Sequence, residues 1–394
     1  MAGYADRRIE IGVRDQARFG AGIVAELPDA IGSTGGSAVF VVTDPGVVGS
    51  GVAGRVADIV KAARVPVEVY EGVEANPGRR SIEAGSAALR AFTTPRESLT
   101  VVGLGGGSAM DSAKVIALHA TNDVAVIGLG YHDQAMQSGL PVIAIPTTAG
   151  TGSETNTYGV ITDDRVGRKA YIGHESVLPR LAILDPQLTV GLPPGPTAAT
   201  GVDAMTHALE SLLSRNPNPF AESIALGVIR TAAEWLPRAV EDGANLEARS
   251  EMLLAAHYAG VGQQSGTGVG AVHAIGHAIG TRGRLAHGTA LATVMPEVFE
   301  TYLGVRDREL ALVGIALGIA DPRAPHDASA QAAVAAISDL LDRLGQRRTL
   351  HAHGLGPETH ETIAQDAIDD AAIRNSPRLP SKDDVLRILA AVGG

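Results

Sequence analysis

Hydrophobic positions in the first 190 residues fall into short runs rich in Val and Ile, separated by polar or glycine-containing segments. Such runs are typical of buried strands, and they predict strands at 38–43, 67–70, 99–103, 124–127, 142–145 and 181–184. Amphipathic stretches between them predict helices at 49–64, 79–93 and 108–120. Strands that alternate with helices indicate a mostly parallel sheet with helices on both faces.

Two other segments of this half also predict strands. The segment GVITDDRVGRKAYI (159–172) predicts a hairpin, because two short apolar stretches flank a polar turn. The segment 8–13 predicts an N-terminal strand, which we expect to pair across a homodimer.

The pattern changes after the segment LPPGPT (192–197), where apolar residues begin to recur at helical spacing. The spacing predicts helices at 198–214, 219–241, 246–265, 269–280, 287–302, 306–318, 326–343, 358–371 and 382–391. We therefore expect two domains, an α/β domain at 1–190 and an all-helical domain at 191–394.

Composition narrows the class of protein. The chain has 394 residues, of which 45% are hydrophobic and 19% charged, as in ordinary globular proteins. The net charge is −11 and basic runs are absent, so nucleic acid is not an expected partner. The sequence shows neither a signal peptide nor an apolar stretch of about 20 residues, so we expect a cytoplasmic protein that does not insert into membranes. Cys is absent, so any metal would need nitrogen and oxygen ligands.

A glycine-rich turn follows the predicted strand at 99–103 and opens a predicted helix. It contains Gly106, Gly107 and Ser108, with Asp111 in the first turns of the helix. Glycines let the backbone approach a pyrophosphate, and a helix N-terminus offers free N–H groups to it. The turn therefore favours phosphate binding, although an ordinary strand-to-helix connection would have the same residues.

Two more candidate sites follow the carboxyl ends of predicted strands, which is where parallel sheets bind ligands. Asp44 could accept hydrogen bonds from an adenosine ribose, or it could only cap a helix. It precedes the glycines by about 60 residues, whereas the usual dinucleotide fingerprint has the acid about 20 residues after them. The segment PTTAGTGSET (146–155) places Thr147, Thr148 and Ser153 after a buried strand, where they could line a ligand groove or cap a helix.

Five residues of the second half carry the clearest chemistry. Asp203 and His207 lie four positions apart, as do His273 and His277, and His287 follows a glycine-broken turn. Residues four apart share one face of a helix, so two helices would present a carboxylate and imidazoles to a divalent transition metal. A single histidine is more often an interior side chain, and Asp203 and Glu210 could simply make pairs with other residues on a helix surface. The complete set favours a metal site.

The motifs together closely resemble those of the iron-containing, or group III, alcohol dehydrogenases. They are GGGSAMDSAK (105–114), PTTAGTGSE (146–154), DPQLTVGLP (185–193), GVDAMTHALES (201–211) and HAIGHAIG with AHGTA (273–290). The resemblance implies a dinucleotide-binding α/β domain with a mostly parallel sheet and an all-helical metal domain, an architecture shared with dehydroquinate synthase. It implies a homodimer or larger homo-oligomer.

The resemblance also implies individual roles. Asp203, His207, His273 and His287 would bind the metal, and His277 would be the catalytic histidine at the substrate. The cofactor residues would be Asp44, Gly106, Gly107, Ser108, Asp111, Thr147, Thr148, Ser153 and Lys169. A late family signal appears here as Asn375-Ser376-Pro377-Arg378, one residue longer than in the family, which puts the role of this segment in doubt.

The expected activity is that of an NAD(P)-dependent alcohol dehydrogenase or aldehyde reductase. The metal would polarise the substrate oxygen while hydride passes between the carbinol carbon and the nicotinamide. Asp44 favours NAD without excluding NADP, and Fe²⁺ is implied by the family although the ligand types suit Zn²⁺ equally well. The alternatives are a maleylacetate reductase, a hydroxyacid–oxoacid transhydrogenase and a lyase resembling dehydroquinate synthase.

Overall fold

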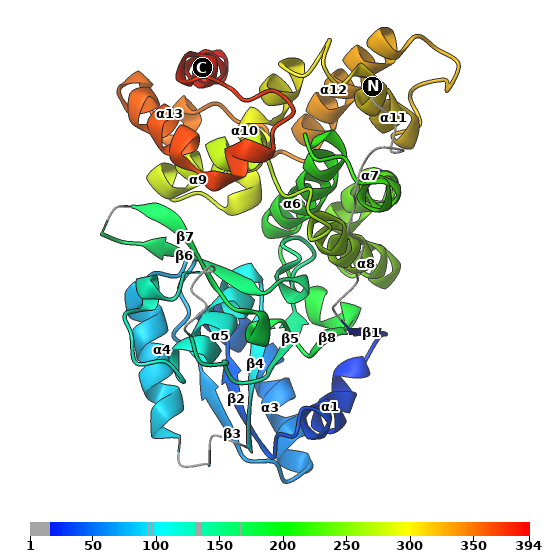
Figure 1. The fold of residues 1–394 in the computed structure, drawn as a ribbon. Helices are drawn as coiled ribbons and strands as arrows, with labels where there is room; N and C mark the ends of the chain where they lie inside the picture. Colours follow the sequence, from blue (N-terminus) through cyan, green and yellow to red (C-terminus); the bar gives the residue numbers. More distant parts are fainter. Residues whose placement is uncertain (1–15, 93–94, 96–97, 131–135, 166) are drawn as a thin grey trace. The chain divides into compact units, whose positions relative to one another are not determined.

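The strands of the first half form a parallel sheet in the computed structural model, which describes residues 16–92, 95, 98–130, 136–165 and 167–394 (Figure 1). Within these residues the sheet has six strands in the order β1-β8-β5-β4-β2-β3. Their bounds are β1 Ala17–Phe19, β2 Ala38–Val42, β3 Val67–Tyr70, β4 Leu99–Gly105, β5 Val142–Pro146 and β8 Leu181–Leu184. The parallel sheet is confirmed, whereas the strand expected at 8–13 lies outside the described residues.

Strands β6 (Tyr158–Asp163) and β7 (Arg168–Gly173) form a separate antiparallel pair, as the hairpin pattern predicts. The helices of this half are α1 Leu27–Ser33, α2 Pro45–Gly49, α3 Val52–Ala62, α4 Arg79–Ala91 and α5 Gly107–His119. Alternate residues of β2 face opposite sides of the sheet: Phe40 packs in one core with Ile116 of α5, and Val41 packs in another with Val56 of α3. Helices therefore cover both faces, and the central strands β2, β4 and β5 are buried along their whole length for that reason.

The predicted strand at 124–127 is wrong. Its residues form a loop that leads into a short 3-10 helix, Val126–Gly128. Val124 is exposed, and its carbonyl lies 3.1 Å from Nε2 of the buried His119 rather than in a sheet ladder. Strands β4 and β5 pair directly with each other, so the sheet offers no place for a strand between them.

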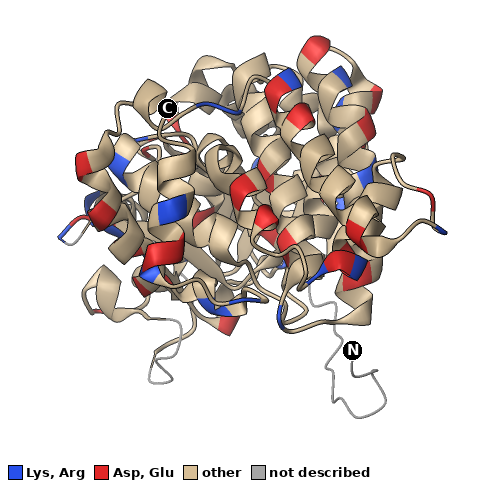
Figure 2. Cartoon of the chain, turned by 90° about the horizontal axis from the view of Figure 1, so that it is seen from above, with Lys and Arg blue, Asp and Glu red and all other residues tan. Residues whose placement is uncertain are grey.

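The second half contains long helices, as its periodicity predicts. They are α6 Pro194–Leu213, α7 Pro219–Glu241, α8 Leu246–Gln263, α9 Ala271–Gly283, α10 His287–Glu300, α11 Asp307–Ala316, α12 His326–Arg343, α13 His360–Asp369 and α14 Lys382–Ala391. No helix in the described ranges is long and apolar enough to cross a membrane. Acidic and basic residues are interspersed along the elements (Figure 2).

The described residues group into two units, which are not continuous in sequence. The sheet unit holds the residues up to Gly201 together with Trp235–His257, and the helical unit holds Val202–Glu234 and Tyr258–Gly394. Helices α6, α7 and α8 thus contribute residues to both units. A division into domains at residue 190 stays a prediction.

Candidate functional site

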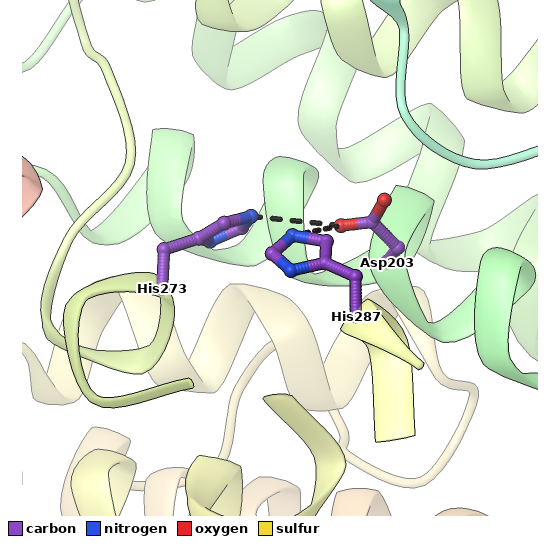
Figure 3. Close-up of side chains that lie close together, drawn as sticks. All are labelled: Asp203, His273 and His287. Carbon is purple, nitrogen blue, oxygen red and sulfur yellow. Dashed lines mark ion pairs between the residues drawn. The ribbon is translucent and has the colours of Figure 1, made fainter. Parts of the chain in front are cut away.

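Asp203 is the centre of the histidine cluster in the helical unit. Its Oδ1 atom lies 3.8 Å from Nε2 of His207, 3.5 Å from Nε2 of His273 and 3.4 Å from Nε2 of His287. Asp203 and His207 come from successive turns of α6, His273 from α9, and His287 is the first residue of α10. Figure 3 shows the side chains of Asp203, His273 and His287 pointing toward one another.

The spacing of these atoms suits a divalent metal. Ligands at about 2.1 Å from a tetrahedral ion lie about 3.4 Å from one another, close to the distances around Asp203 Oδ1. Asp203 Oδ1 and His273 Nε2 are buried, and neither has a hydrogen-bond partner among the described residues. Buried polar atoms without a partner are costly, and an ion bound between these two would satisfy both. The residues present therefore fit the metal that the sequence implies.

The pKa values in the cluster reflect burial and mutual charge. Burial alone would raise the pKa of Asp203, but the imidazoles of His207, His287 and His273 outweigh it and hold the pKa well below its ordinary value. Burial would lower the pKa of His273, but its interactions with Asp203 and Glu210 raise it to about 9. The pKa of His287 is lowered, mainly by burial. The site thus keeps a carboxylate and favours a neutral imidazole at His287, both suited to metal ligation.

Each of the two α9 histidines, His273 and His277, forms a hydrogen bond through its Nδ1 atom with a carboxylate. Glu210 Oε2 lies 2.6 Å from Nδ1 of His273, and Asp370 Oδ2 lies 2.8 Å from Nδ1 of His277. The His277 ring stacks against that of His287, with 5.3 Å between the ring centroids. His277 lies outside the closely spaced group of Asp203, His273 and His287, as does His207, whose Nε2 is 3.8 Å from Asp203 Oδ1.

Sequence reasoning missed the roles of Glu210 and Asp370. The alternative that Asp203 and Glu210 make pairs on a helix surface is wrong, because both are buried, with exposed fractions of 2% and 4%. Glu210 follows His207 by three positions and Asp203 by seven, which places all three on one face of α6, and this spacing could have identified it. Asp370 lies 93 residues from His277, and the sequence contains no signal that connects them.

The segment 375–378, left in doubt by its extra residue, lies against the start of α9. The Asn375 side chain donates to the Val269 carbonyl at 3.0 Å, and Ser376 is buried. A Cβ atom at Gly270 would lie 3.3 Å from Ser376 Oγ, which shows how closely the segment packs there. These contacts support the helix that carries His273 and His277.

The predicted cofactor residues of the sheet unit gather at the carboxyl ends of β2, β4 and β5. Asp44 follows β2, and its Oδ2 would lie 3.1 Å from a Cβ atom at Gly105, at the end of the neighbouring β4. Gly105 has φ +147°, a conformation that favours glycine. Asp44 Oδ1 accepts from Gly46 N and Val47 N, so Asp44 caps α2, while its contact with a ribose stays a prediction.

The glycine-rich turn at 105–108 and the segment 146–155, here called the threonine segment, face each other. A Cβ atom at Gly106 would lie 3.3 Å from Thr148 Cγ2, and Thr147 donates its N–H to the Gly105 carbonyl at 2.9 Å. Helix α5 begins at Gly107, and its N-cap residue, Gly106, has no side chain that could cap the first-turn amides. The Thr148 hydroxyl is buried and lacks a hydrogen-bond partner within the described ranges.

Asp111 and Ser153 bind each other. Asp111 Oδ1 accepts from Ser153 Oγ at 2.5 Å, and its Oδ2 accepts from Val160 N at 3.0 Å. The ammonium group of the fully buried Lys114 donates to the Ser153 carbonyl at 2.8 Å. Burial lowers the pKa of Lys114, while Asp111 acts in the opposite direction. Asp111 thus ties α5 to the threonine segment and to the hairpin, a role that sequence reasoning did not foresee.

Lys169 projects from β7 of the hairpin. Its ammonium group donates to Asn76 Oδ1 at 2.8 Å, and burial lowers its pKa to about 8. A lysine with a pKa near neutrality can change charge in the physiological range, and such residues are candidates for functional sites.

Family models match nearly the whole chain. The model described as "Iron-containing alcohol dehydrogenase" matches residues 15–186, and the model described as "Fe-containing alcohol dehydrogenase family, C-terminal" matches residues 197–393. The chain belongs to the iron-containing alcohol dehydrogenase family. The expectation of an alcohol dehydrogenase enzyme is confirmed at this level.

Named relatives agree with this family. The chain is 33% identical over 372 residues to Alcohol dehydrogenase 4 of Saccharomyces cerevisiae, covering 94% of this chain and 95% of that protein. The alcohol dehydrogenase from Oenococcus oeni superposes with a TM-score of 0.92 at 27% identity, covering 98% and 100% of the two chains. Sulfoacetaldehyde reductase from Bifidobacterium kashiwanohense, solved in complex with NAD⁺, superposes with a TM-score of 0.87 at 27% identity, covering 98% and 99%.

Proposed function

We propose that this chain is a metal-dependent, NAD-linked alcohol dehydrogenase that also reduces the corresponding aldehyde or ketone. The observation that carries the proposal is the convergence of three imidazole Nε2 atoms on Asp203 Oδ1, at 3.4–3.8 Å, in a member of this family. A structural role alone would not explain a buried carboxylate oxygen that faces three imidazole nitrogens and has no hydrogen-bond partner among the described residues.

The proposed metal ligands are Asp203, His207, His273 and His287. A divalent ion bound there would act as a Lewis acid on the substrate oxygen and stabilise the charge that develops on it. Family membership favours Fe²⁺. Three imidazoles and one carboxylate also suit Zn²⁺, which stands above Fe²⁺ in the general order of affinity.

The proposed cofactor is NAD, held by residues of the sheet unit. The amides at the start of α5, after Gly106 and Gly107, would bind the pyrophosphate with the help of the helix dipole. Asp44 would accept hydrogen bonds from the adenosine ribose and repel the 2′-phosphate of NADP. The NAD⁺ complex of the structurally similar sulfoacetaldehyde reductase supports this choice. Thr147, Thr148, Ser153 and Lys169 would border the same groove, and Asp111 would act on it through Ser153.

His277 is the proposed route for the substrate proton. Asp370 accepts from Nδ1, so the other ring nitrogen, Nε2, is the one left to exchange a proton with the substrate or a water molecule. Burial alone would raise the pKa of Asp370, but the hydrogen bond from His277 outweighs it and keeps the pKa low, so the carboxylate stays charged and fixes the ring.

Metal content, measured together with NADH formation against a panel of alcohols, tests the proposal. We expect one metal ion per wild-type chain, and loss of both metal and activity in His287→Ala. Bound metal with no net NADH from any alcohol would favour the transhydrogenase or the lyase instead. A reconstituted protein without metal would overturn the proposal. The homo-oligomer and the cytoplasmic location stay predictions, which sedimentation and cell fractionation would measure.

A further inference from the structure

Glu210 makes two hydrogen bonds at the start of α9, and both are buried. Its Oε1 accepts from the backbone N–H of Val272 at 2.8 Å, and its Oε2 lies 2.6 Å from Nδ1 of His273. A Cβ atom at Gly270 would lie 3.0 Å from Oε1, so the glycine lets the backbone approach the carboxylate. The side chain of Glu210 therefore reaches from α6 to α9 with each oxygen committed to one donor.

These two bonds determine which nitrogen of His273 carries a proton. A carboxylate accepts hydrogen bonds and does not donate them, so Nδ1 of His273 must be the donor. In the neutral imidazole the lone pair then lies on Nε2, the atom that faces Asp203 Oδ1 at 3.5 Å. The opposite tautomer would place a proton on Nε2 and remove the lone pair that a metal ion needs.

We propose that Glu210 is a positioning residue that holds His273 in its metal-binding tautomer and orientation and thereby sets the affinity of the site for a divalent ion. The proposal rests on the metal site proposed above. Carboxylates that orient metal-binding histidines in this way contribute strongly to affinity, and their loss weakens metal binding by about 10- to 100-fold.

The substitution Glu210→Gln distinguishes the effect of the hydrogen bond to Val272 N–H from that of the hydrogen bond to His273 Nδ1. The amide has one acceptor oxygen, and its nitrogen donates, so it cannot accept from Val272 N–H and His273 Nδ1–H together. If the oxygen stays with Val272, the amide N–H meets Nδ1 and favours the tautomer with a proton on Nε2. Capping of α9 can thus survive in this variant while the metal-binding form of His273 is disfavoured.

The test is the affinity of the full-length protein for Zn²⁺, measured by competition with a chromophoric chelator at neutral pH. We expect Glu210→Gln to bind Zn²⁺ about 10- to 100-fold more weakly than the wild type. Glu309→Gln is the matched control, because Glu309 is also buried in the helical unit but pairs with Arg308, and its affinity should equal that of the wild type. Thermal unfolding of the metal-free proteins shows whether each variant folds.

Wild-type affinity in folded Glu210→Gln would overturn the proposal, even if the variant unfolds at a lower temperature, because Glu210 would then only cap α9. If Glu210→Gln does not fold, Glu210→Asp provides the test. Aspartate keeps the charge but is one methylene too short to reach both donors, so we expect weaker Zn²⁺ binding. Unchanged Zn²⁺ binding in this variant would overturn the proposal. Failure of the wild type itself to bind Zn²⁺ or Fe²⁺ would instead overturn the metal site of the proposed function.

Discussion

Asp370 Oδ2 accepts a hydrogen bond from His277 Nδ1 at 2.8 Å, while its Oδ1 accepts the backbone N–H of Ala372 at 2.8 Å. Both oxygens of one carboxylate are therefore committed, one to the histidine and one to the turn that follows α13. This arrangement fixes the ring of His277 relative to α9 and makes Asp370 a residue on which turnover should depend.

We predict that Asp370→Asn lowers kcat by about tenfold or more, because the amide can accept only one of the two hydrogen bonds and leaves His277 poorly held. The metal content should stay at the wild-type value, since Asp370 contacts none of the proposed ligands through a hydrogen bond that the structure describes. Asp369→Asn changes the neighbouring exposed carboxylate and serves as the control. Steady-state kinetics and metal analysis check the prediction, and an unchanged kcat would contradict it.

Asp44→Ser should relax the choice between NAD and NADP. Serine can still cap α2, so the fold around Gly46 and Val47 is kept, while the negative charge near the adenosine ribose is lost. We expect the ratio of kcat/KM for NAD to that for NADP to fall by about tenfold or more, which corresponds to about 1.4 kcal/mol. Kinetics with each cofactor measure it, and an unchanged ratio would show that Asp44 serves only as a cap.

The strands that end near the proposed cofactor residues could be predicted from the sequence, but which strand ends lie beside each other could not. The runs at 38–43 and 99–103 each predict a buried strand, and a strand forms at each. That Asp44 and Gly105 lie side by side follows from the pairing of β2 with β4, which no local pattern encodes. At 124–127 the apolar run was misleading, because only the pairing of β4 with β5 excludes a strand there.

The proposed metal site could likewise be predicted only in part. Periodicity alone puts Asp203, His207 and Glu210 on one face of α6, and a complete reading of that face would have included Glu210. The approach of α9 and α10 to that face, and of Asp370 to His277, depends on packing between helices far apart in sequence. Tertiary contacts of this kind leave no periodic signal.

Gly107→Ala and Gly54→Ala should change stability in opposite directions. A Cβ atom at Gly107 would lie 2.6 Å from Thr151 Cγ2, so the threonine segment must shift, and we expect a loss of about 1–3 kcal/mol together with weaker NAD binding. A Cβ atom at Gly54, exposed within α3, meets nothing within 4 Å, and we expect a gain of about 0.5–1 kcal/mol. Chemical denaturation measures both free energies of unfolding, and a stable Gly107→Ala would contradict the close packing.

Lys169 should make NAD binding depend on pH. Burial lowers its pKa from the ordinary 10.5 to about 8, so in the folded protein the ammonium group is present below about pH 8 and is lost above it. Between these two pKa values the unfolded chain binds more protons than the folded one, so this lysine makes the folded state relatively more stable as pH rises through the interval. Binding of the cofactor should change in the opposite sense, because an ammonium group donates to ribose hydroxyls more strongly than a neutral amine.

We therefore expect the affinity for NAD to weaken several-fold as pH rises through about 8, measured by calorimetric titration of the full-length protein. Lys169→Met should bind NAD more weakly at every pH and lose this step, because the titrating group is gone. Lys169→Arg should also lose the step while binding more tightly than Lys169→Met, since a guanidinium stays charged throughout the range. A step that persists in Lys169→Met would assign the titration to another group and remove Lys169 from the cofactor site.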